Sequence, residues 1–350
     1  ELVADTNRLL RWISLTIAFV SPFLIWSQFS SRDNHGWQDA VTGTVAALVG
    51  MVPEGLVLLT SLAFMIATIS LARRSTLVQE LPAVEALARV DVVCLDKTGT
   101  LTDGDVRLDR VELCSGSQES ATRAVAQLVL LDGRFAHLPD VVAEGRRVVA
   151  NIERAANLFL VKNVYSLVLA VIVAFTRTAY PFAPIQLTLI SAVTIGIPGF
   201  ALALGPNHRR YVPGFLNRVL RFAIPVGIVT GVSAYAGYFA TTLLDHGADV
   251  AEGRTTATLT VLIISMWTLL VLARPLTGWK RGLVAGMALV VAVIVAVPAL
   301  GHGNFLLEVT PLRLTIAAII GAAGALLVEL THRSILILVR LATDDPSTST

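Results

Sequence analysis

The chain has 350 residues, of which 55% are hydrophobic and 15% are charged, and its mean hydropathy is +0.72. A soluble domain carries about 25% charged residues, so this composition excludes an ordinary soluble enzyme and predicts a lipid environment. The net charge of +2 is too small to indicate a nucleic-acid partner.

Membrane-spanning helices are predicted at about eight places, because a span needs about 20 mostly apolar residues that satisfy their own backbone hydrogen bonds. The candidate spans are residues 9–30, 40–71, 155–176, 184–204, 219–242, 257–273, 283–300 and 312–340. The second and the last are long enough to extend beyond a bilayer or to be broken within it.

A polar interval separates the second span from the third. Its segment Val90–Leu95 is short and rich in β-branched side chains, which predicts a buried strand. Residues 119–131 are predicted to form a helix that ends in a turn. We therefore expect a chain divided into two spans, an incomplete cytoplasmic domain with its stalk, six spans and a disordered polar tail. The corresponding boundaries are 1–72, 73–150, 151–342 and 343–350.

Basic residues gather on one side of the membrane if the spans alternate in direction. That side holds Arg8, Arg11, Arg73, Arg74, Arg209, Arg210, Arg218, Arg221, Arg274, Lys280, Arg281, Arg333 and Arg340. The opposite side holds Arg32, Arg177, Arg254 and Arg313. Cytoplasmic loops are enriched in basic residues, so the bias predicts that the polar interval and both termini are cytoplasmic.

A phosphoryl-transfer motif follows the predicted strand directly. The heptad Asp96-Lys-Thr-Gly-Thr-Leu-Thr102 places a carboxylate at the carboxyl end of that strand, before a glycine-containing turn. Asp96 could act as a covalent nucleophile that forms an aspartyl phosphate. Lys97 could offset the phosphoryl charge, and the amide and hydroxyl of Thr98 could hold its oxygens. The alternative for a shorter match is an ordinary polar turn.

A candidate cation site lies inside the second span, at Val49-Gly-Met-Val-Pro-Glu-Gly-Leu56. Pro53 removes a backbone donor and should break the helix, which leaves the carbonyls of Val49, Gly50 and Val52 in need of a partner. Glu54 is the acidic residue within this span, and a carboxylate in lipid indicates function. The alternative is a protonated Glu54 hydrogen-bonded to a neighbouring helix.

The heptad resembles the phosphorylation signature of P-type ATPases, and Pro-Glu-Gly-Leu resembles their unwound ion-binding helix. The resemblance implies ATP as phosphoryl donor, with Mg²⁺ held at Asp96 and Thr98. It also implies a cation site in which the third and fourth spans supply side chains beside the broken helix. The ion-binding positions carried over are Val49, Gly50, Val52, Glu54, Asn163, Ser166, Ser191 and Thr194.

The identity of the cation is suggested by hard oxygen ligands, which suit Ca²⁺, Mg²⁺ or alkali ions. Where calcium pumps of the family carry carboxylates, this chain has Ser166 and Ile195, so Glu54 is nearly alone in charge. The pattern resembles the actinobacterial branch of cation-transporting P-type ATPases, which implies Ca²⁺ as substrate in a bacterial plasma membrane. Mg²⁺, Mn²⁺ and K⁺ are alternatives. Lys162 could act as a built-in counter-charge, although a snorkelling or helix-capping role explains it equally.

The resemblance also implies missing parts. The chain begins at the third membrane helix of the family plan, and the actuator and nucleotide-binding domains are absent, with the ATP site. The expected fold is therefore an α-helical polytopic membrane protein with a remnant of a cytoplasmic α/β (HAD-like) phosphorylation domain. We predict a monomer that does not phosphorylate itself. A non-enzymatic membrane remnant or channel is the alternative, whereas Thr98 argues against a membrane-tethered phosphatase.

Overall fold

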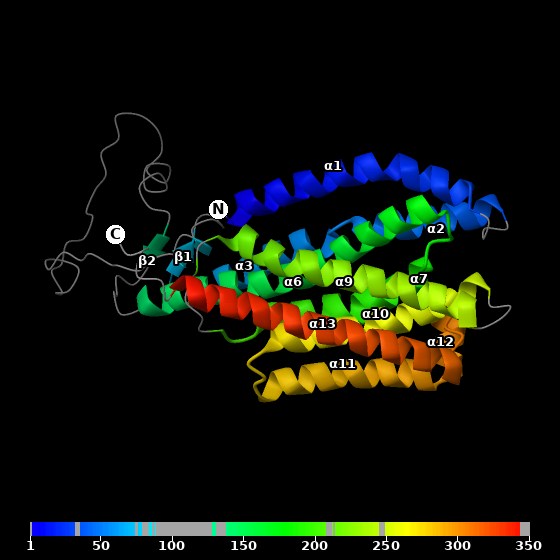
Figure 1. Ribbon diagram of the computed structural model, residues 1–350. Coiled ribbons are helices and arrows are strands. Elements are labelled where there is room, and N and C mark those ends of the chain that lie inside the picture. Colours follow the sequence, from blue (N-terminus) through cyan, green and yellow to red (C-terminus); the bar gives the residue numbers. More distant parts are fainter. Residues whose placement is uncertain are drawn as a thin grey trace, which may run out of the picture.

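The computed structural model is a bundle of helices that run roughly along a common axis, with a pair of short strands at one end (Figure 1). The residues it describes are 2–31, 36–73, 76–78, 84–85, 88, 128–130, 138–207, 212, 214–244 and 249–343. Seven apolar helical segments among them are long enough to cross a membrane. The expectation of a polytopic membrane protein is therefore confirmed.

The first part of the chain forms α1 (Leu2–Phe29), α2 (Trp37–Met51), α3 (Glu54–Ala72), β1 (Thr76–Val78) and β2 (Leu128–Leu130). The central part forms the long α6 (Leu138–Thr176), then α7 (Pro184–Ser191), the π-helical turn η2 (Ala192–Gly196) and α8 (Ile197–Leu204). The last part forms α9 (Phe215–Leu244), α10 (Val250–Ala273), α11 (Gly278–Ala296), α12 (Pro298–Phe305) and α13 (Pro311–Thr343).

The predicted spans correspond to these helices with one difference. Segment 40–71, which was expected to be broken at Pro53, forms α2 and α3 with Val52 and Pro53 between them, so it is not among the seven long segments. The difference is segment 283–300, which stops at Ala296, and Pro298 begins the separate helix α12. Proline favours the first turn of a helix, where its missing N–H would be unpaired in any case. The long last segment forms one helix that begins at Pro311.

The prediction of a helix over 119–131 is wrong for residues 128–130, which are the part of this range that the structure describes. Leu128–Leu130 is a strand that pairs antiparallel with Thr76–Val78, and Val129 lies opposite Leu77. A run of three apolar residues carries no decisive periodicity, so its pairing with a distant apolar segment determines the structure. The predicted strand Val90–Leu95 and the tail from residue 344 onward lie outside the described residues.

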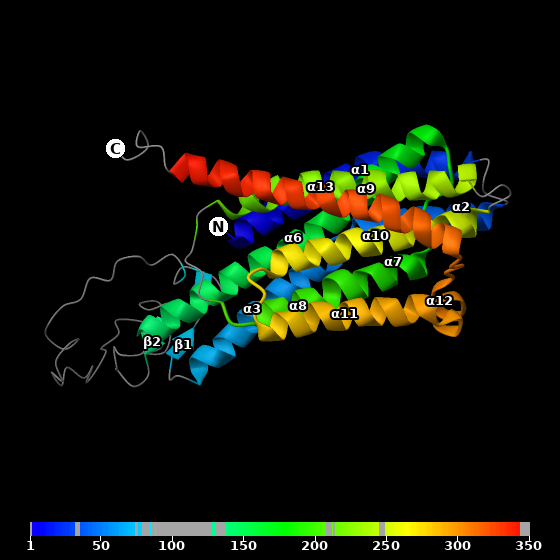
Figure 2. The ribbon, with the colours of Figure 1, turned by 60° about the horizontal axis from the view of Figure 1, so that its bottom comes forward.

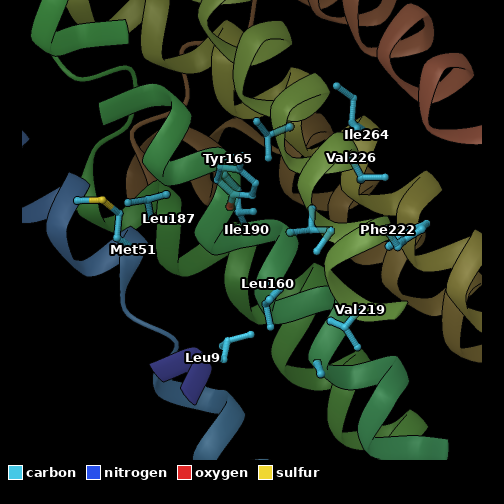
Figure 3. Packing of buried hydrophobic residues seen from close by; sticks show 14 of the residues in the cluster. Leu9, Met51, Leu160, Tyr165, Leu187, Ile190, Val219, Phe222, Val226 and Ile264 are labelled. Atoms are coloured by element: carbon cyan, nitrogen blue, oxygen red, sulfur yellow. The ribbon is translucent and has the colours of Figure 1, made fainter. Parts of the chain in front are cut away.

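The hydrophobic core is centred on α6, which packs most extensively against α9 and also contacts α1, α2, α3 and α8. Figure 3 shows Leu160 and Tyr165 of α6 facing Val219 and Val226 of α9. Glycine permits this close approach, because a Cβ added at Gly227 would lie 2.4 Å from Val164 Cβ. Helix α11 instead runs along the outer edge of the bundle (Figure 2) and is mostly exposed.

The end of the bundle that carries β1 and β2 is called the strand end here, and the opposite end the far end. Helices α1, α6, α9 and α11 begin at the strand end, whereas α3, α8, α10 and α13 finish there (Figures 1 and 2). The described arginines at the far end include Arg177, Arg254 and Arg313. The strand end holds a longer series, namely Arg8, Arg11, Arg73, Arg146, Arg147, Arg218, Arg221, Arg274, Arg281 and Arg333.

Candidate functional site: a broken helix beside α6

The centre of the candidate site is an interruption between two helices. Helix α2 ends at Met51 and α3 begins at Glu54, so Val52 and Pro53 lie between them without helical structure. The Val52 amide donates to the Val49 carbonyl over 3.3 Å, which closes the end of α2 with a tight turn. The Val49 carbonyl therefore has one backbone partner already and retains one lone pair for another.

Glu54 is the first residue of α3, directly after the interruption. Its backbone position places it at a helix N-terminus inside the bundle, whereas its side chain lies outside the described part of the structure. Val49 and Val52 are 44% and 38% exposed, and these residues could contribute to a site through their backbone carbonyls.

Ser166 of α6 contacts the end of α2 at Gly50. A Cβ added at Gly50 would lie 2.8 Å from Ser166 Oγ, which is closer than real Cβ contacts allow. Glycine is therefore required at this position for α6 and α2 to approach so closely. The Ser166 side chain is completely buried, and its Oγ has no hydrogen-bond partner among the described residues.

Asn163 lies one turn before Ser166 on α6 and is 6% exposed. Neither its Oδ1 nor its Nδ2 has a hydrogen-bond partner within the part of the chain that the structure describes. The amide lines a mostly apolar cavity of about 300 Å³ between α1, α6 and α9, which Thr16 and Met51 also line. Buried polar atoms without partners cost about 1–3 kcal/mol each, so they indicate a site that interacts with a ligand.

Thr194 occupies a different environment from Asn163. It lies in the π-helical turn η2, is completely buried, and its Oγ1 donates to the Ile190 carbonyl over 2.7 Å. It lines a separate cavity of about 10 Å³, whose other lining residues are Leu158, Val161, Lys162, Tyr165, Ile195, Ser265 and Thr268. The structure thus brings Ser166 to Gly50, with Asn163 beside Met51, and places Thr194 with Lys162 on the side of α10.

The π-helical turn itself was not predicted from the sequence. Pro198 has no amide hydrogen, so the carbonyl of Thr194 loses the donor that an α-helix would supply four residues later. Such local widening is common at functional sites in helices. Ser191 is half-buried at the end of α7, immediately before this turn, and Ile195 packs in a small apolar cluster with Leu202.

Sequence reasoning also missed two tyrosines beside the broken helix. Tyr165 of α6 and Tyr180 of the α6–α7 connection are both buried, and neither hydroxyl has a hydrogen-bond partner among the described residues. Figure 3 shows Tyr165 next to Ile190, with Leu187 lying toward Met51 at the end of α2. Tyrosine inside an apolar segment was the available signal, because its hydroxyl usually needs a partner when it is buried.

The phosphorylation heptad, with Asp96, Lys97 and Thr98 and the Mg²⁺ position assigned to Asp96 and Thr98, lies outside the described residues. The strands β1 and β2 flank it in sequence, and they pair with each other at the strand end near the start of α6 (Figure 2). The chain segment that contains the heptad therefore leaves and re-enters the described structure at the strand end.

Known proteins similar to this chain are cation-transporting ATPases, although no family model matches it. A calcium-transporting ATPase CtpE of Mycobacterium bovis is 42% identical over 232 residues, which cover 63% of this chain and 29% of that protein. CtpE of Mycolicibacterium smegmatis is 27% identical over 571 residues, covering 94% of this chain and 72% of the relative. A probable cation-transporting ATPase exp7 of Streptococcus pneumoniae is 37% identical over 119 residues, 32% of this chain and 15% of the relative.

The chain is therefore similar in sequence to cation-transporting ATPases over part of their length. The similarity to the M. smegmatis ATPase extends over nearly the whole chain, yet the aligned length of 571 residues exceeds the 350 residues present here. That relative therefore carries additional residues within the aligned region. The chain also spans less than a third of the M. bovis ATPase.

Proposed function

We propose that this protein binds and moves a hard cation, most simply Ca²⁺, as part of a P-type ATPase. The observation that carries the proposal is the interruption at Val52–Pro53, which faces a helix whose Asn163 and Ser166 are buried without partners. A cation near the middle of a membrane protein is typically held where helices are broken and carbonyl oxygens become accessible. Calcium is favoured as the cation because two of the relatives are named calcium-transporting ATPases.

The proposed cation site combines neutral oxygens with one carboxylate. The Gly50 and Val52 carbonyls, the Asn163 amide and the Ser166 hydroxyl would surround the ion, with Glu54 as its charged ligand. Oxygen ligands of this kind suit Ca²⁺, and a single carboxylate suits one divalent ion better than two. Thr194 and Ser191 would contribute to cation binding from the next helical segment, because they do not line the cavity that Asn163 lines.

The proposed energy source is phosphorylation of Asp96. The carboxylate would attack the γ-phosphorus of ATP, so that an aspartyl phosphate forms as the bond to ADP breaks. Lys97 and Thr98 would stabilise the phosphoryl oxygens, with Mg²⁺ at Asp96 and Thr98. The strand end would then be cytoplasmic, in agreement with the basic residues that gather there.

The cation site is tested on the full chain purified into lipid nanodiscs. We expect calorimetric titration to detect Ca²⁺ binding, and we expect Glu54→Gln to weaken it by about tenfold or more, because the charged ligand is lost. Glu308→Gln is the matched control, since Glu308 lies at the far end beside Arg313. Binding that is unchanged in Glu54→Gln, or equally weakened in both variants, would contradict the assignment.

The phosphorylation step is tested with labelled ATP. We expect no acyl phosphate on this 350-residue chain, because its sequence contains no recognisable nucleotide-binding motif. Acid-stable, hydroxylamine-sensitive labelling that disappears in Asp96→Asn would overturn the expected inactivity while supporting Asp96 as nucleophile. Equal labelling in Asp96→Asn would overturn the mechanism.

A further inference from the structure

The small cavity that Thr194 lines lies between α6, η2 and α10, which pack against one another. Its volume of about 10 Å³ is close to the space that one water molecule needs. We call it the lysine cavity, because a lysine of α6 is among the residues around it. Its polar lining residues are Lys162 and Tyr165 of α6, Thr194 of η2, and Ser265 and Thr268 of α10.

The hydroxyls of the lysine cavity are arranged to accept hydrogen bonds. Thr194 Oγ1 donates its proton to the Ile190 carbonyl over 2.7 Å. Thr268 Oγ1 likewise donates to the Ile264 carbonyl over 2.9 Å. A hydroxyl has one proton, so both oxygens have only lone pairs left for a ligand. The Tyr165 oxygen has no hydrogen-bond partner among the described residues. The lysine cavity therefore favours a group that donates several hydrogen bonds.

Negative charge is missing from the lining of the lysine cavity, because none of the described residues around it is acidic. Calcium sites gain affinity from charged ligands, whereas a divalent ion here would meet the positive charge of Lys162 instead. An ammonium group is about as large as a water molecule and carries three donors and one charge. It therefore matches a small space that is lined by neutral acceptor oxygens.

Lys162 lies deep within the bundle. It is half-buried and lies about four turns of α6, or about 21 Å, before Thr176 at the far end. This distance is much longer than a lysine side chain, so the ammonium group cannot reach the far end by snorkelling. Toward the strand end, Leu158 and Ile195 close the lysine cavity by packing with Leu269 in an apolar cluster. A charge at this depth is costly and indicates function.

We propose that the Lys162 ammonium group fills the lysine cavity as a built-in cation, so that the protein binds one Ca²⁺ at the broken helix and Lys162 takes the place of a second. This inference rests on the proposed function and adds the number of ions to it. Asn163, a proposed Ca²⁺ ligand, follows Lys162 directly but lines the cavity between α1, α6 and α9. The two positive charges are therefore separated by α6 and repel each other across it.

The repulsion between Lys162 and the bound ion has two consequences. It limits the affinity for Ca²⁺, which favours release of the ion from the broken helix. Because the ammonium group is covalently attached, it also stays behind when Ca²⁺ leaves. The acceptor oxygens of the lysine cavity thus keep a cation throughout, and no second ion from outside is needed to satisfy them.

The test is calorimetric titration of the full chain in lipid nanodiscs with Ca²⁺, and we expect one Ca²⁺ per chain. Lys162→Met keeps a long side chain but removes the charge, so Ca²⁺ binding should tighten by about tenfold. Lys162→Glu places a carboxylate beside the hydroxyls of Thr194 and Thr268, and it should raise the stoichiometry to two Ca²⁺ per chain. Lys280→Met is the matched control, because Lys280 lies on α11 and its Nζ donates to the Pro275 carbonyl. It should leave the affinity unchanged.

Several results would overturn the role of Lys162. They are a parent chain that binds two Ca²⁺, a Lys162→Met protein that binds Ca²⁺ no more tightly than Lys280→Met, and a Lys162→Glu protein that still binds one. A lower Tm of Lys162→Met with unchanged affinity would show that the lysine is structural. If Glu54→Gln weakens Ca²⁺ binding while Lys162→Met does not tighten it, the inference fails alone. If the parent chain binds no Ca²⁺, or Glu54→Gln has no effect, the proposed function fails and the inference fails with it.

Discussion

Asn207 and Asn151 are joined by a hydrogen bond in which Asn207 Nδ2 donates to Asn151 Oδ1 over 2.9 Å. The Asn151 amide in turn donates to the carbonyls of Ala203 and Gly205, over 2.9 and 2.8 Å. Arg147, one turn earlier on α6, donates to the Leu204 carbonyl over 3.0 Å. One turn of α6 thus holds the C-terminal end of α8, the helix that directly follows the turn η2 in which Thr194 lies.

The first prediction concerns this connection. Asn151→Leu should lower the free energy of unfolding by about 2–4 kcal/mol, because it leaves two carbonyls and the Asn207 amide without the partner they have now. The measurement is thermal or denaturant unfolding of the full chain in detergent or nanodiscs.

The matched control for Asn151 is Asn157→Leu on the same helix. Asn157 is also buried, but its Nδ2 bonds to a carbonyl of its own helix and its Oδ1 has no partner among the described residues. We expect little loss of stability there. Equal losses in the two variants would show that Asn151 has no special role in holding α8.

A second prediction follows from the close contact of α6 and α9. Gly227→Ala should destabilise the protein by about 1–3 kcal/mol, because its Cβ would lie 2.4 and 2.5 Å from Val164 side-chain atoms and 3.2 Å from the Tyr165 amide nitrogen. Backbone atoms cannot move aside without separating the helices. The measurement is again the free energy of unfolding.

Gly282→Ala provides the comparison for Gly227. Gly282 lies on the peripheral helix α11, and an added Cβ there would contact nothing within 4 Å. Alanine has the higher helix propensity, so we expect this variant to be neutral or slightly more stable. A Gly227→Ala variant as stable as Gly282→Ala would contradict the tight α6–α9 contact.

The parts of the structure that the sequence predicts well are those set by local chemistry. Length and hydropathy identify the membrane helices, and Pro53 coincides with the interruption because its effect on a helix depends on its own ring and missing donor. The gathering of arginines at the strand end follows from the assumption that successive spans alternate in direction across the membrane. The heptad at Asp96 is recognised from seven residues and remains a prediction.

The parts that the sequence does not predict depend on contacts between distant segments. Leu128–Leu130 becomes a strand because Thr76–Val78 is available as its partner. The spacing of Asn163 and Tyr165 places them on opposite sides of α6, but only the packing of α1 and α10 determines which cavity each one lines. The contact of Tyr180 with Gly43 of α2 arises from a connection between helices, where periodicity gives no guidance.

A third prediction concerns the ion pair between α10 and α13. Arg274 makes two hydrogen bonds of 3.0 and 2.9 Å to the buried carboxylate of Glu329. Arg274→Leu should cost about 1–3 kcal/mol of stability, because Glu329 would lose its bidentate partner. Unfolding measurements on the full chain check this value.

Arg333→Leu is the control for that ion pair. Arg333 also bonds to Glu329, over 2.9 Å, but its side chain is 70% exposed. Exposed ion pairs contribute at most about 1 kcal/mol, so we expect a smaller loss. If Arg333→Leu cost more than Arg274→Leu, the bidentate pair with Arg274 would not be the stronger of the two ion pairs of Glu329.

A fourth prediction concerns the contact between α2 and α6 at the candidate cation site. Gly50→Ala should weaken Ca²⁺ binding by about tenfold, because the new Cβ would lie 2.8 Å from Ser166 Oγ and push α6 away from the interruption. A displacement of this size also moves Asn163, which lies one turn away on the same helix. Calorimetric titration of the full chain with Ca²⁺ measures the change.

Gly286→Ala on α11 is the matched control for Gly50, because an added Cβ there would contact nothing within 4 Å. It should leave Ca²⁺ binding unchanged. A Gly50→Ala protein that is folded and binds Ca²⁺ as tightly as this control would place the cation away from the α2–α6 contact. Loss of binding in Gly50→Ala with an unchanged Tm would instead locate the effect at the site, since general unfolding would lower both.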